Sequence, residues 1–251
     1  MVETKQKIIL IAGANGKLGK IFAKYLDDLG HILILIDKDK INYSDSLKNK
    51  NSIFNQIDLN SIKDFEKNIN LITNKFGKLD AAINAVYPKS EKWGTKFEDL
   101  ELEIVNKHLN LQLGLHIIFA QRIINLFISQ GYGNLINISS IMGISSPKFS
   151  HYEGTQMSSP IEYTVSKSGI ISFTKYLAKY YKNKNIRVNC ISPGGIFENQ
   201  DKTFVENYKK SCCNKGLLDP IDICGTLNFL LSDDSKYING QNIIVDDGWS
   251  L

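Results

Sequence analysis

Cysteine is scarce in this sequence, with four residues in a chain of 251. Cys190, Cys212, Cys213 and Cys224 form no CxxC pair, and no histidine stands beside them at the spacing of a zinc site. Such cysteines are expected to be free thiols, which persist in reducing compartments. We therefore expect a cytoplasmic protein without a bound metal.

Uninterrupted apolar sequence is also missing. The longest apolar region, Leu113 to Ile128, contains His116, Gln121, Arg122 and Asn125. A membrane span needs about 20 mostly apolar residues, whereas these interruptions are typical of a mostly buried helix. The N-terminus shows no signal-peptide pattern, because charged residues lead directly into a short apolar run. The sequence therefore predicts a soluble protein with no membrane partner.

The charge is neither strong nor clustered. Lysine and arginine total 30 against 26 acidic residues, which gives a net charge of +4, and the basic residues are spread along the chain. A nucleic-acid-binding surface gathers such residues into a patch, so no nucleic-acid partner is expected. The chain is 43% hydrophobic and has no repeats, low-complexity segments or linkers, so residues 1–251 are predicted to form a single domain with a large core.

A glycine turn lies between the first two apolar runs. Residues 8–12 and 32–36 are continuously apolar, as in parallel strands that are covered on both faces. Three glycines within residues 13–19 open a helical pattern, and Asp37 follows the second run. Glycines let a pyrophosphate approach the backbone, the helix N-terminus offers N–H groups, and the acid accepts from a ribose. This unit predicts dinucleotide binding, and a turn with only a packing role is the alternative.

Apolar runs and helical patterns alternate along the rest of the chain. Further strands are expected over residues 53–57, 79–86, 134–138, 186–191 and 242–245. Helical patterns separate them, and the longest covers residues 102–129. Alternating strands and helices predict an α/β fold with one doubly wound parallel sheet and helices on both faces.

A helical pattern over residues 162–177 carries Tyr163 and Lys167, one turn apart on one face. An ammonium beside a phenol stabilises the phenolate and lowers a pKa that is about 10 when unperturbed, as a general base near neutrality requires. The same offset also occurs by chance on many helices. The face of this helix that is expected to be buried contains Ile170, Ile171, Phe173, Tyr176, Leu177 and Tyr180.

Several motifs together resemble one family in their order and approximate spacing. They are the glycine turn of residues 13–19, Asp58-Leu59, Asn84-Ala85, Ser139-Ser140, Tyr163-Thr164-Val165-Ser166-Lys167, the segment Asn189 to Gly194, and the tail Asn239 to Trp249. They make the chain similar, over nearly its full length, to the compact short-chain dehydrogenase/reductases. The resemblance implies a single-domain Rossmann fold with seven strands, a nicotinamide cofactor, and a homodimer or homotetramer.

The resemblance also implies roles for individual residues. Tyr163 corresponds to the general acid/base, Lys167 to the group that lowers its pKa and binds the nicotinamide ribose, and Ser140 to the hydroxyl that orients the substrate oxygen. Contacts with the cofactor are implied for Gly13, Asn15, Gly16, Lys17, Leu18, Gly19, Asp37, Asp58, Leu59, Asn84, Ala85, Tyr163, Lys167, Pro193, Gly194 and Ile196.

Three features depart from the usual family pattern. The glycine spacing within residues 13–19 is GxxGxxG, which is typical of the sugar-nucleotide-modifying branch. Tyr87 replaces a small residue near the nicotinamide and is a candidate substrate contact. The family places an asparagine that holds a proton-relay water in the helix before the serine. Gln112 fits the spacing of that position, and Asn110 fits its residue type.

The choice of cofactor follows from Asp37. A carboxylate at this position accepts hydrogen bonds from a free ribose diol and repels a 2′-phosphate, which favours NAD over NADP. Lys17 and Lys38 are nearby cations that would blunt this preference, so NADP stays an alternative.

Two segments are expected to shape the substrate site: residues 147–160, which we name the insert, and residues 196–218, which we name the lid. The insert is polar and contains His151 and Glu153, so the predicted substrate is a hydroxylated small molecule. An exposed loop without a substrate role is the alternative for these two residues. In the lid, Phe197 is expected either to close over the substrate or to serve in packing.

These features predict an NAD(P)-dependent oxidoreductase that interconverts an alcohol and a carbonyl. The insert and residues 245–250 also resemble oxidoreductases of bacterial flagellin-glycosylation and sialic-acid-like sugar loci, which implies a sugar-like substrate. Two alternatives are open. The glycine spacing suggests a sugar epimerase or dehydratase that retains NAD, whereas Tyr87 and Gln112 suggest a nucleotide-binding scaffold without catalysis.

Overall fold

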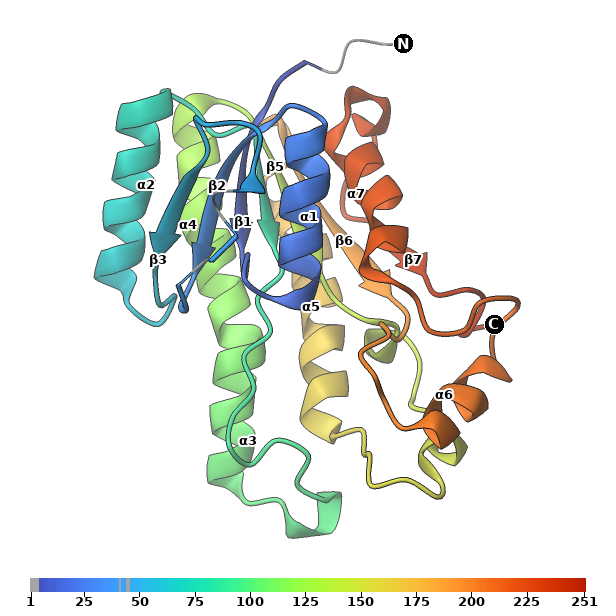
Figure 1. The fold of residues 1–251 in the computed structure, drawn as a ribbon. Coiled ribbons are helices and arrows are strands. Elements are labelled where there is room, and N and C mark those ends of the chain that lie inside the picture. The colour runs from blue at the N-terminus through green and yellow to red at the C-terminus, as the bar shows by residue number, and fades with distance from the viewer. Residues whose placement is uncertain (1–4, 41, 44–45) are drawn as a thin grey trace.

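A seven-stranded parallel sheet forms the centre of the protein (Figure 1). The computed structural model describes residues 5–40, 42–43 and 46–251. In spatial order β3-β2-β1-β4-β5-β6-β7, the strands are β3 (Ile53–Gln56), β2 (Ile32–Asp37), β1 (Ile8–Ala12), β4 (Ala81–Asn84), β5 (Gly133–Ile138), β6 (Ile186–Pro193) and β7 (Asn242–Val245). The predicted doubly wound parallel sheet is therefore confirmed.

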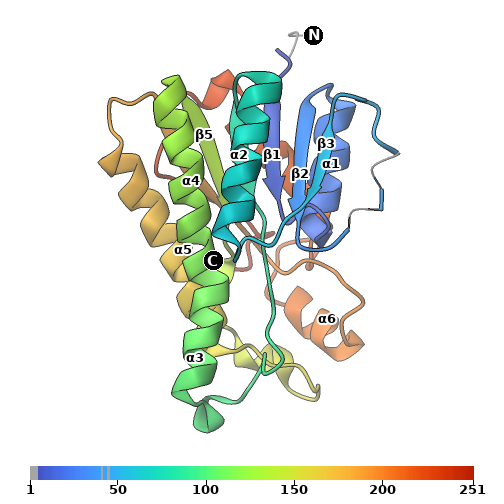
Figure 2. The same ribbon diagram turned by 90° about the vertical axis from the view of Figure 1, so that its left-hand side faces the viewer.

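Helices cover both faces of the sheet (Figures 1 and 2). On one face lie α1 (Lys17–Asp28) and α7 (Cys224–Leu231), and on the other lie α2 (Ile62–Phe76), α4 (Leu115–Gln130) and α5 (Ile161–Tyr180). Short 3-10 turns occupy Phe97–Asp99, Ile141–Gly143, Phe149–Tyr152, Pro220–Ile223 and Asp233–Ser235, while α3 (Leu102–Leu109) and α6 (Lys202–Lys209) lie beyond the carboxyl ends of the strands.

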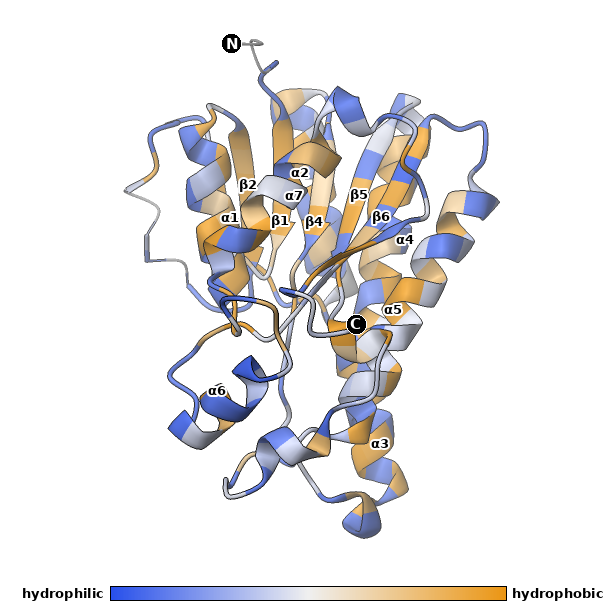
Figure 3. Cartoon of the chain, turned by 90° about the vertical axis from the view of Figure 1, so that its right-hand side faces the viewer, coloured by the Kyte–Doolittle hydropathy of each residue, from blue (hydrophilic) through white to orange (hydrophobic). Residues whose placement is uncertain are grey.

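The strands are apolar throughout because both of their faces are buried. In β1, Ile9 and Ile11 pack toward Phe22 of α1, whereas Leu10 packs toward Phe119 of α4. Figure 3 shows the strands mainly in the hydrophobic colour, whereas α6 is mostly hydrophilic. This two-sided burial is the physical reason that continuous apolar runs located the strands of a parallel sheet.

The long helix predicted over residues 102–129 contains a π-helical turn. Asn110–Gly114 forms this turn between α3 and α4, and the Leu115 N–H donates to the Asn110 carbonyl. Figure 2 shows α3 and α4 as one continuous rod. Residues 102–130 are long and apolar enough for a membrane span by composition. However, Phe119 and Ile123 are buried against the sheet, so this is a core helix.

The predicted buried face of α5 is wrong at two positions. Ile170 is fully buried, but Tyr176 and Tyr180 are 61% and 66% exposed and stack on each other with ring centroids 5.5 Å apart. The inward face of α5 is set by Lys167, Ile170 and Thr174. Because a helix turns about 100° per residue, Tyr176 falls on the opposite side.

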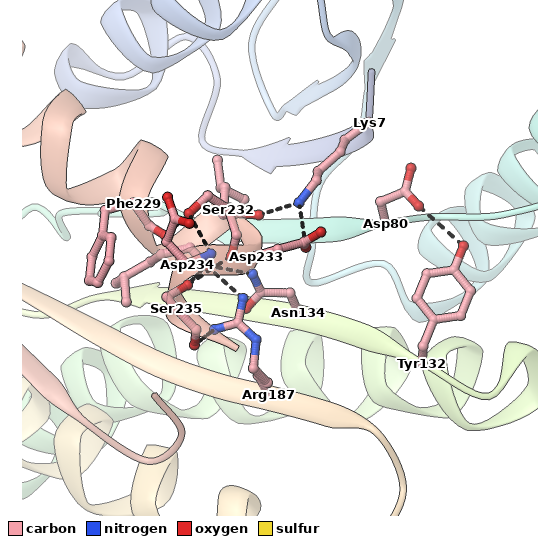
Figure 4. Close-up of polar contacts among 12 residues, drawn as sticks. Lys7, Asp80, Tyr132, Asn134, Arg187, Phe229, Ser232, Asp233, Asp234 and Ser235 are labelled. Carbon is pink, nitrogen blue, oxygen red and sulfur yellow. Dashed lines mark hydrogen bonds and ion pairs between the residues drawn. The ribbon is translucent and has the colours of Figure 1, made fainter. Parts of the chain in front are cut away.

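Polar side chains cap the end of α7 beside the amino ends of the strands (Figure 4). The Arg187 guanidinium donates to the carbonyls of Leu230 at 2.8 Å, Ser235 at 3.0 Å and Ile238 at 3.3 Å. Asn134 Nδ2 also donates to the Leu230 carbonyl, at 2.8 Å. The last carbonyls of a helix have no partner within the helix, so these side chains supply donors that α7 itself lacks.

We expect Arg187→Met to lower the free energy of unfolding by about 2–3 kcal/mol, because three partly buried carbonyls lose a charged donor. The matched control is Lys215→Met, which removes exposed ion pairs with Asp219 and Asp222 and should cost less than about 1 kcal/mol. Urea denaturation of the three proteins measures both changes. Equal losses in the two variants would contradict the capping role of Arg187.

Candidate active site

A cavity of about 640 Å³ opens at the carboxyl ends of the strands. Its wall contains most of the residues predicted from the sequence: Gly13, Asn15, Gly16, Lys17, Leu18, Asp37, Asp58, Leu59, Ala85, Tyr87, Ser140, Tyr163, Lys167, Pro193, Gly194 and Ile196. Gly19, Asn84, Asn110, Gln112, His151, Glu153 and Phe197 are not on this wall. The structure therefore gathers the predicted glycine turn and the predicted catalytic residues around one space.

Two glycines of the turn stand where the backbone of neighbouring residues leaves no room for a side chain. Gly13 has a φ of +76°, and a Cβ there would lie 2.7 Å from the Ala85 carbonyl oxygen of the neighbouring strand. A Cβ on Gly19 would lie 2.1 Å from the Gly13 carbonyl oxygen, so Gly19 lets α1 start directly against the turn. The N-terminus of α1 thus faces the cavity with its N–H groups, which is the usual site for a pyrophosphate.

Asp37 ends β2 at the rim of this cavity. Its carboxylate accepts from the Asn15 N–H at 2.8 Å and from the Asp39 N–H at 3.1 Å. These two backbone donors fix the carboxylate where it can accept from ribose hydroxyls. In the loop after β3, Asp58 accepts from the Asn60 N–H at 2.9 Å, and both residues line the same wall.

Lys17 binds the lid in this structure. Its ammonium donates to the Phe197 carbonyl and lies 3.8 Å from a carboxylate oxygen of Glu198. Lys17 was one of the two cations expected to weaken the preference of Asp37 for NAD. In this structure its ammonium instead contacts Phe197 and Glu198. Phe197 itself is 42% exposed, and it lines a second pocket within the lid, together with Gln200 and Val205.

Ser140, Tyr163 and Lys167 meet at the inner end of the cavity. Ser140 and Tyr163 line the same wall, and the Ser140 hydroxyl acts to lower the pKa of Tyr163. Ser140 Oγ accepts from the Met142 N–H at 3.2 Å. Lys167 is 3% exposed, and its ammonium donates to the Ile138 carbonyl at 3.2 Å. Ser139 points elsewhere and donates to the Lys167 carbonyl at 2.8 Å, so Ser140 is the serine beside the phenol.

Burial controls the pKa values of Tyr163 and Lys167. Loss of hydration raises the pKa of Tyr163, and the neighbouring Ser140 hydroxyl offsets only part of this increase. Burial also lowers the pKa of Lys167 to about 8. The expectation of a phenol pKa lowered toward neutrality is thus not met in this structure, because desolvation outweighs the neighbouring groups. A protonated phenol is suited to act as an acid, as carbonyl reduction requires.

An aromatic wall stands next to Tyr163. The rings of Tyr87 and Trp93 meet the Tyr163 ring edge to face, with centroids 5.6 Å and 5.8 Å away. Tyr87 and Trp93 are 5.7 Å apart, and the Lys167 ammonium lies 5.4 Å from the Tyr87 centroid. Tyr87 therefore contacts Tyr163 directly. Trp93 was not identified from the sequence, because an irregular loop has no periodic pattern that assigns its side chains to a site.

The insert does not bring His151 to the cavity. His151 is 4% exposed, its Nε2 lies 2.9 Å from Ser211 Oγ, and its ring packs between Tyr208 and Trp249 at 5.5 Å and 5.7 Å. This burial, together with the charge of Lys148, lowers the pKa of His151. His151 therefore holds the insert against the lid and the C-terminal segment, and it does not face the cavity.

Other residues of the insert line the cavity instead. Glu153 is exposed, whereas Tyr152, Ser158 and Ser159 stand on the cavity wall. The Ser159 side chain acts to lower the pKa of Tyr152, although burial raises it overall. The Tyr152 ring packs 5.1 Å from Phe204 of the lid. The insert thus reaches the cavity, but the residues that it presents there are neighbours of His151 and Glu153.

The structure separates the two candidates for the asparagine position. Gln112 is fully buried, and its Nε2 donates to the Pro88 carbonyl. Asn110 is exposed, and its side chain lies against Gly114 on the outside of the π turn. Gln112 is thus the candidate that points into the protein. Asn84 is buried as well, and its Oδ1 accepts from the Val86 N–H at 3.4 Å.

Among residues 5–40, 42–43 and 46–251, no three His, Cys, Asp or Glu side chains are grouped so that they could hold a metal ion.

Comparison with known proteins agrees with this geometry. A family model described as enoyl-(acyl carrier protein) reductase matches residues 13–250. The chain is 42% identical to post-translational flagellin modification protein A of Campylobacter coli, over 98% of this chain and 99% of that protein. It is 29% identical to a 7alpha-hydroxysteroid dehydrogenase of Bacteroides fragilis, over 98% and 95% of the two chains.

Solved structures show the same architecture. The crystal structure of a short chain dehydrogenase from Leptospira borgpetersenii with bound NAD+ superposes with a TM-score of 0.88. It is 31% identical and is matched over 98% of this chain and 94% of that one. A 4-hydroxyisoleucine dehydrogenase complexed with NADH and succinate gives a TM-score of 0.80 at 26% identity, over 96% and 98% of the two chains.

Proposed function

The chain belongs to the short-chain dehydrogenase/reductase family, and on this basis we propose that it is a cytoplasmic NAD-dependent enzyme that interconverts an alcohol and a carbonyl on a sugar-like molecule. The observation that carries the proposal is the grouping of Ser140, Tyr163 and the buried Lys167, whose ammonium lies 5.6 Å from the Tyr163 ring centroid, on the wall of a cavity that also contains the glycine turn.

The proposed mechanism divides the reaction between cofactor and protein. The bound nicotinamide supplies or accepts the hydride. In the reductive direction, Tyr163 donates its phenolic proton to the substrate oxygen, while the Ser140 hydroxyl orients that oxygen and stabilises the resulting phenolate. The Lys167 ammonium adds positive charge beside the phenolate, and its bond to the Ile138 carbonyl fixes its position. Oxidation follows the same steps in reverse.

NAD is proposed as the cofactor, with NADP as the weaker alternative. The Asp37 carboxylate, fixed by two backbone donors, repels a 2′-phosphate and accepts from a free ribose diol. Lys17 is engaged by the lid, so it offers less compensation for that phosphate. The bound NAD+ in the Leptospira structure is in keeping with this choice.

A hydroxylated, sugar-like substrate suits the surface next to Tyr163. The Tyr87 and Trp93 rings give flat apolar faces on which the C–H face of a sugar ring can pack. Ser158 and Ser159, on the same cavity wall, add hydroxyls. The 42% identity to a flagellin modification protein over nearly the full chain also supports a sugar-related substrate. As for other members of the family, we propose a homodimer or homotetramer.

The proposed function is tested by a screen of sugars, keto-sugars and polyols that follows the reduced cofactor with NAD and NADP in parallel. We expect turnover with NAD to exceed turnover with NADP by at least about tenfold in kcat/KM, which corresponds to about 1.4 kcal/mol of discrimination against the 2′-phosphate.

The outcomes of the screen separate the alternatives. Conversion of a sugar with no net change in reduced cofactor would indicate an epimerase or dehydratase that retains NAD. Cofactor binding with no conversion of any substrate would instead support a nucleotide-binding scaffold. Equal turnover with NADP would contradict the role given to Asp37.

A further inference from the structure

Residues 87–93, which we name the wall segment, follow β4 and contain no helix or strand. Tyr87, Lys89 and Trp93 of this segment stand on the cavity wall. One backbone hydrogen bond closes within the segment, from the Trp93 N–H to the Ser90 carbonyl at 3.2 Å. Segments with little backbone pairing open easily, so side-chain contacts are needed to hold these rings in one place.

Two buried side chains of the neighbouring helix anchor the wall segment. In α3, His108 is 1% exposed, and its Nε2 is hydrogen-bonded to Ser90 Oγ at 2.7 Å. In the π turn that follows α3, the fully buried Gln112 donates from Nε2 to the Pro88 carbonyl. The two contacts hold alternate residues of the segment against the continuous rod that α3 and α4 form in Figure 2.

His108 also supports the last ring of the wall segment. Its imidazole centroid lies 5.3 Å from that of Trp93, with the two ring planes 32° apart. The same indole meets the Tyr163 ring edge to face at 5.8 Å. His108 therefore contacts the segment twice, at Ser90 and at Trp93, and Trp93 links it to the proposed proton donor. His108 itself is not on the cavity wall.

The end of the wall segment lies beside the insert. Gly94 has a φ of +89°, and a Cβ there would lie 3.4 Å from Ser158 Oγ. Ser158 and Ser159 stand on the cavity wall with Trp93. The position of the segment thus sets the spacing between an aromatic face and the hydroxyls of the insert. A sugar ring presents an apolar face and polar edges, so this spacing is what it would recognise.

We propose that His108 is a positioning residue for the substrate, which keeps the wall segment as a preformed platform for the apolar face of a sugar ring beside Tyr163. It acts through Ser90 and Trp93 and not on the reacting atoms. A platform that is already ordered in the free protein loses less entropy on binding, which raises affinity. The use of the platform by a sugar rests on the proposed function, whereas the anchoring of the segment does not.

The test measures amide hydrogen exchange of the wall segment by mass spectrometry. His108→Leu removes both contacts, and Ser90→Ala removes the hydrogen bond alone. Exchange in the segment should be about five- to tenfold faster in each variant, as for the loss of one hydrogen bond. His108→Gln keeps a polar partner for Ser90 and should restore part of the protection. The matched control is Ser129→Ala, which removes a hydrogen bond to the Leu126 carbonyl near the end of α4 and should leave the segment unchanged.

The outcomes keep this inference apart from the function. Unchanged exchange in the wall segment would overturn the anchoring role, whether or not a substrate is known. An equal increase in the wall segment and in α6 would also overturn it, because His108 would then stabilise the whole fold. Faster exchange of the segment alone, in a protein without turnover, would leave the anchoring intact and count against the proposed reaction. If His108→Leu does not fold, Ser90→Ala decides between these outcomes.

With a substrate in hand, steady-state kinetics add a readout that a purely structural role would not move. A platform that binds substrate and transition state equally well affects KM and not kcat. KM for the sugar should rise about five- to tenfold in His108→Leu and in Ser90→Ala. The value of kcat should stay within about twofold of the wild type, and NADH affinity should not change. A fall in kcat with an unchanged KM would contradict the platform.

Discussion

Tyr163→Phe is expected to lower kcat by about 10²–10⁴-fold, which is the usual contribution of a general acid/base. The phenylalanine keeps the ring that packs against Tyr87 and Trp93, so the cavity should keep its shape. What is lost is the phenolic hydroxyl on the cavity wall that Tyr163 shares with Ser140. NADH affinity, measured by fluorescence titration, should change little, because the glycine turn and Asp37 are untouched.

The matched control for this variant is Tyr152→Phe. Tyr152 lines the same cavity, but the side chain that influences its hydroxyl is Ser159 and not Ser140. Its removal should change kcat by less than about tenfold, as for a single hydrogen bond of about 1 kcal/mol. Equal losses in the two variants would mean that Tyr163 contributes a binding contact and is not the proton donor.

Lys167→Met is expected to abolish measurable turnover and to make the protein more stable at pH 7. Folding moves Lys167 from water to a buried site and lowers its pKa from 10.5 to about 8. A lowered pKa for a base means that the charged form is disfavoured in the folded state. The shift corresponds to a cost of about 3 kcal/mol at neutral pH. Loss of the hydrogen bond to the Ile138 carbonyl offsets about 1 kcal/mol, so a net gain of about 1–2 kcal/mol is expected.

The stabilisation expected for Lys167→Met depends on pH. The cost of burying the charge is fully present below the folded pKa of about 8 and fades as the pH rises toward 10.5, where the lysine is neutral in both states. Urea denaturation should therefore show the gain at pH 7 and little of it at pH 10. Lys175→Met, an exposed lysine on the same helix, should alter neither stability nor turnover. A destabilised Lys167→Met at pH 7 would contradict the cost assigned to burial.

The first strand and the glycine turn could be predicted from the local sequence alone. The strand predicted over residues 8–12 agrees with β1 (Ile8–Ala12), because strand burial on both faces leaves a continuous apolar signal. The Gly13 conformation and the close approach at Gly19 are also local requirements. The offset between Tyr163 and Lys167 likewise survives folding, since a helix converts a four-residue spacing into adjacency.

Features that depend on distant contacts were not predictable in this way. His151 is buried by Tyr208 and Trp249, which lie far along the chain, so a polar residue in a polar insert gave no signal of burial. The π turn at Asn110–Gly114 adds a residue to one helical turn without interrupting the apolar pattern. The raised pKa of Tyr163 depends on burial that only tertiary packing creates.

The two tryptophans of this sequence give the protein a built-in optical probe. Trp93 stands in the aromatic wall beside Tyr163, and Trp249 is fully buried and stacked on Tyr208 under the insert. Selective excitation of tryptophan therefore reports on the immediate surroundings of the cavity, with almost no background from the rest of the chain. Quenching by a ligand would come mainly from Trp93, whereas a red shift on unfolding would come mainly from Trp249. Single substitutions at these two positions would separate occupancy of the cavity from docking of the insert without any attached label.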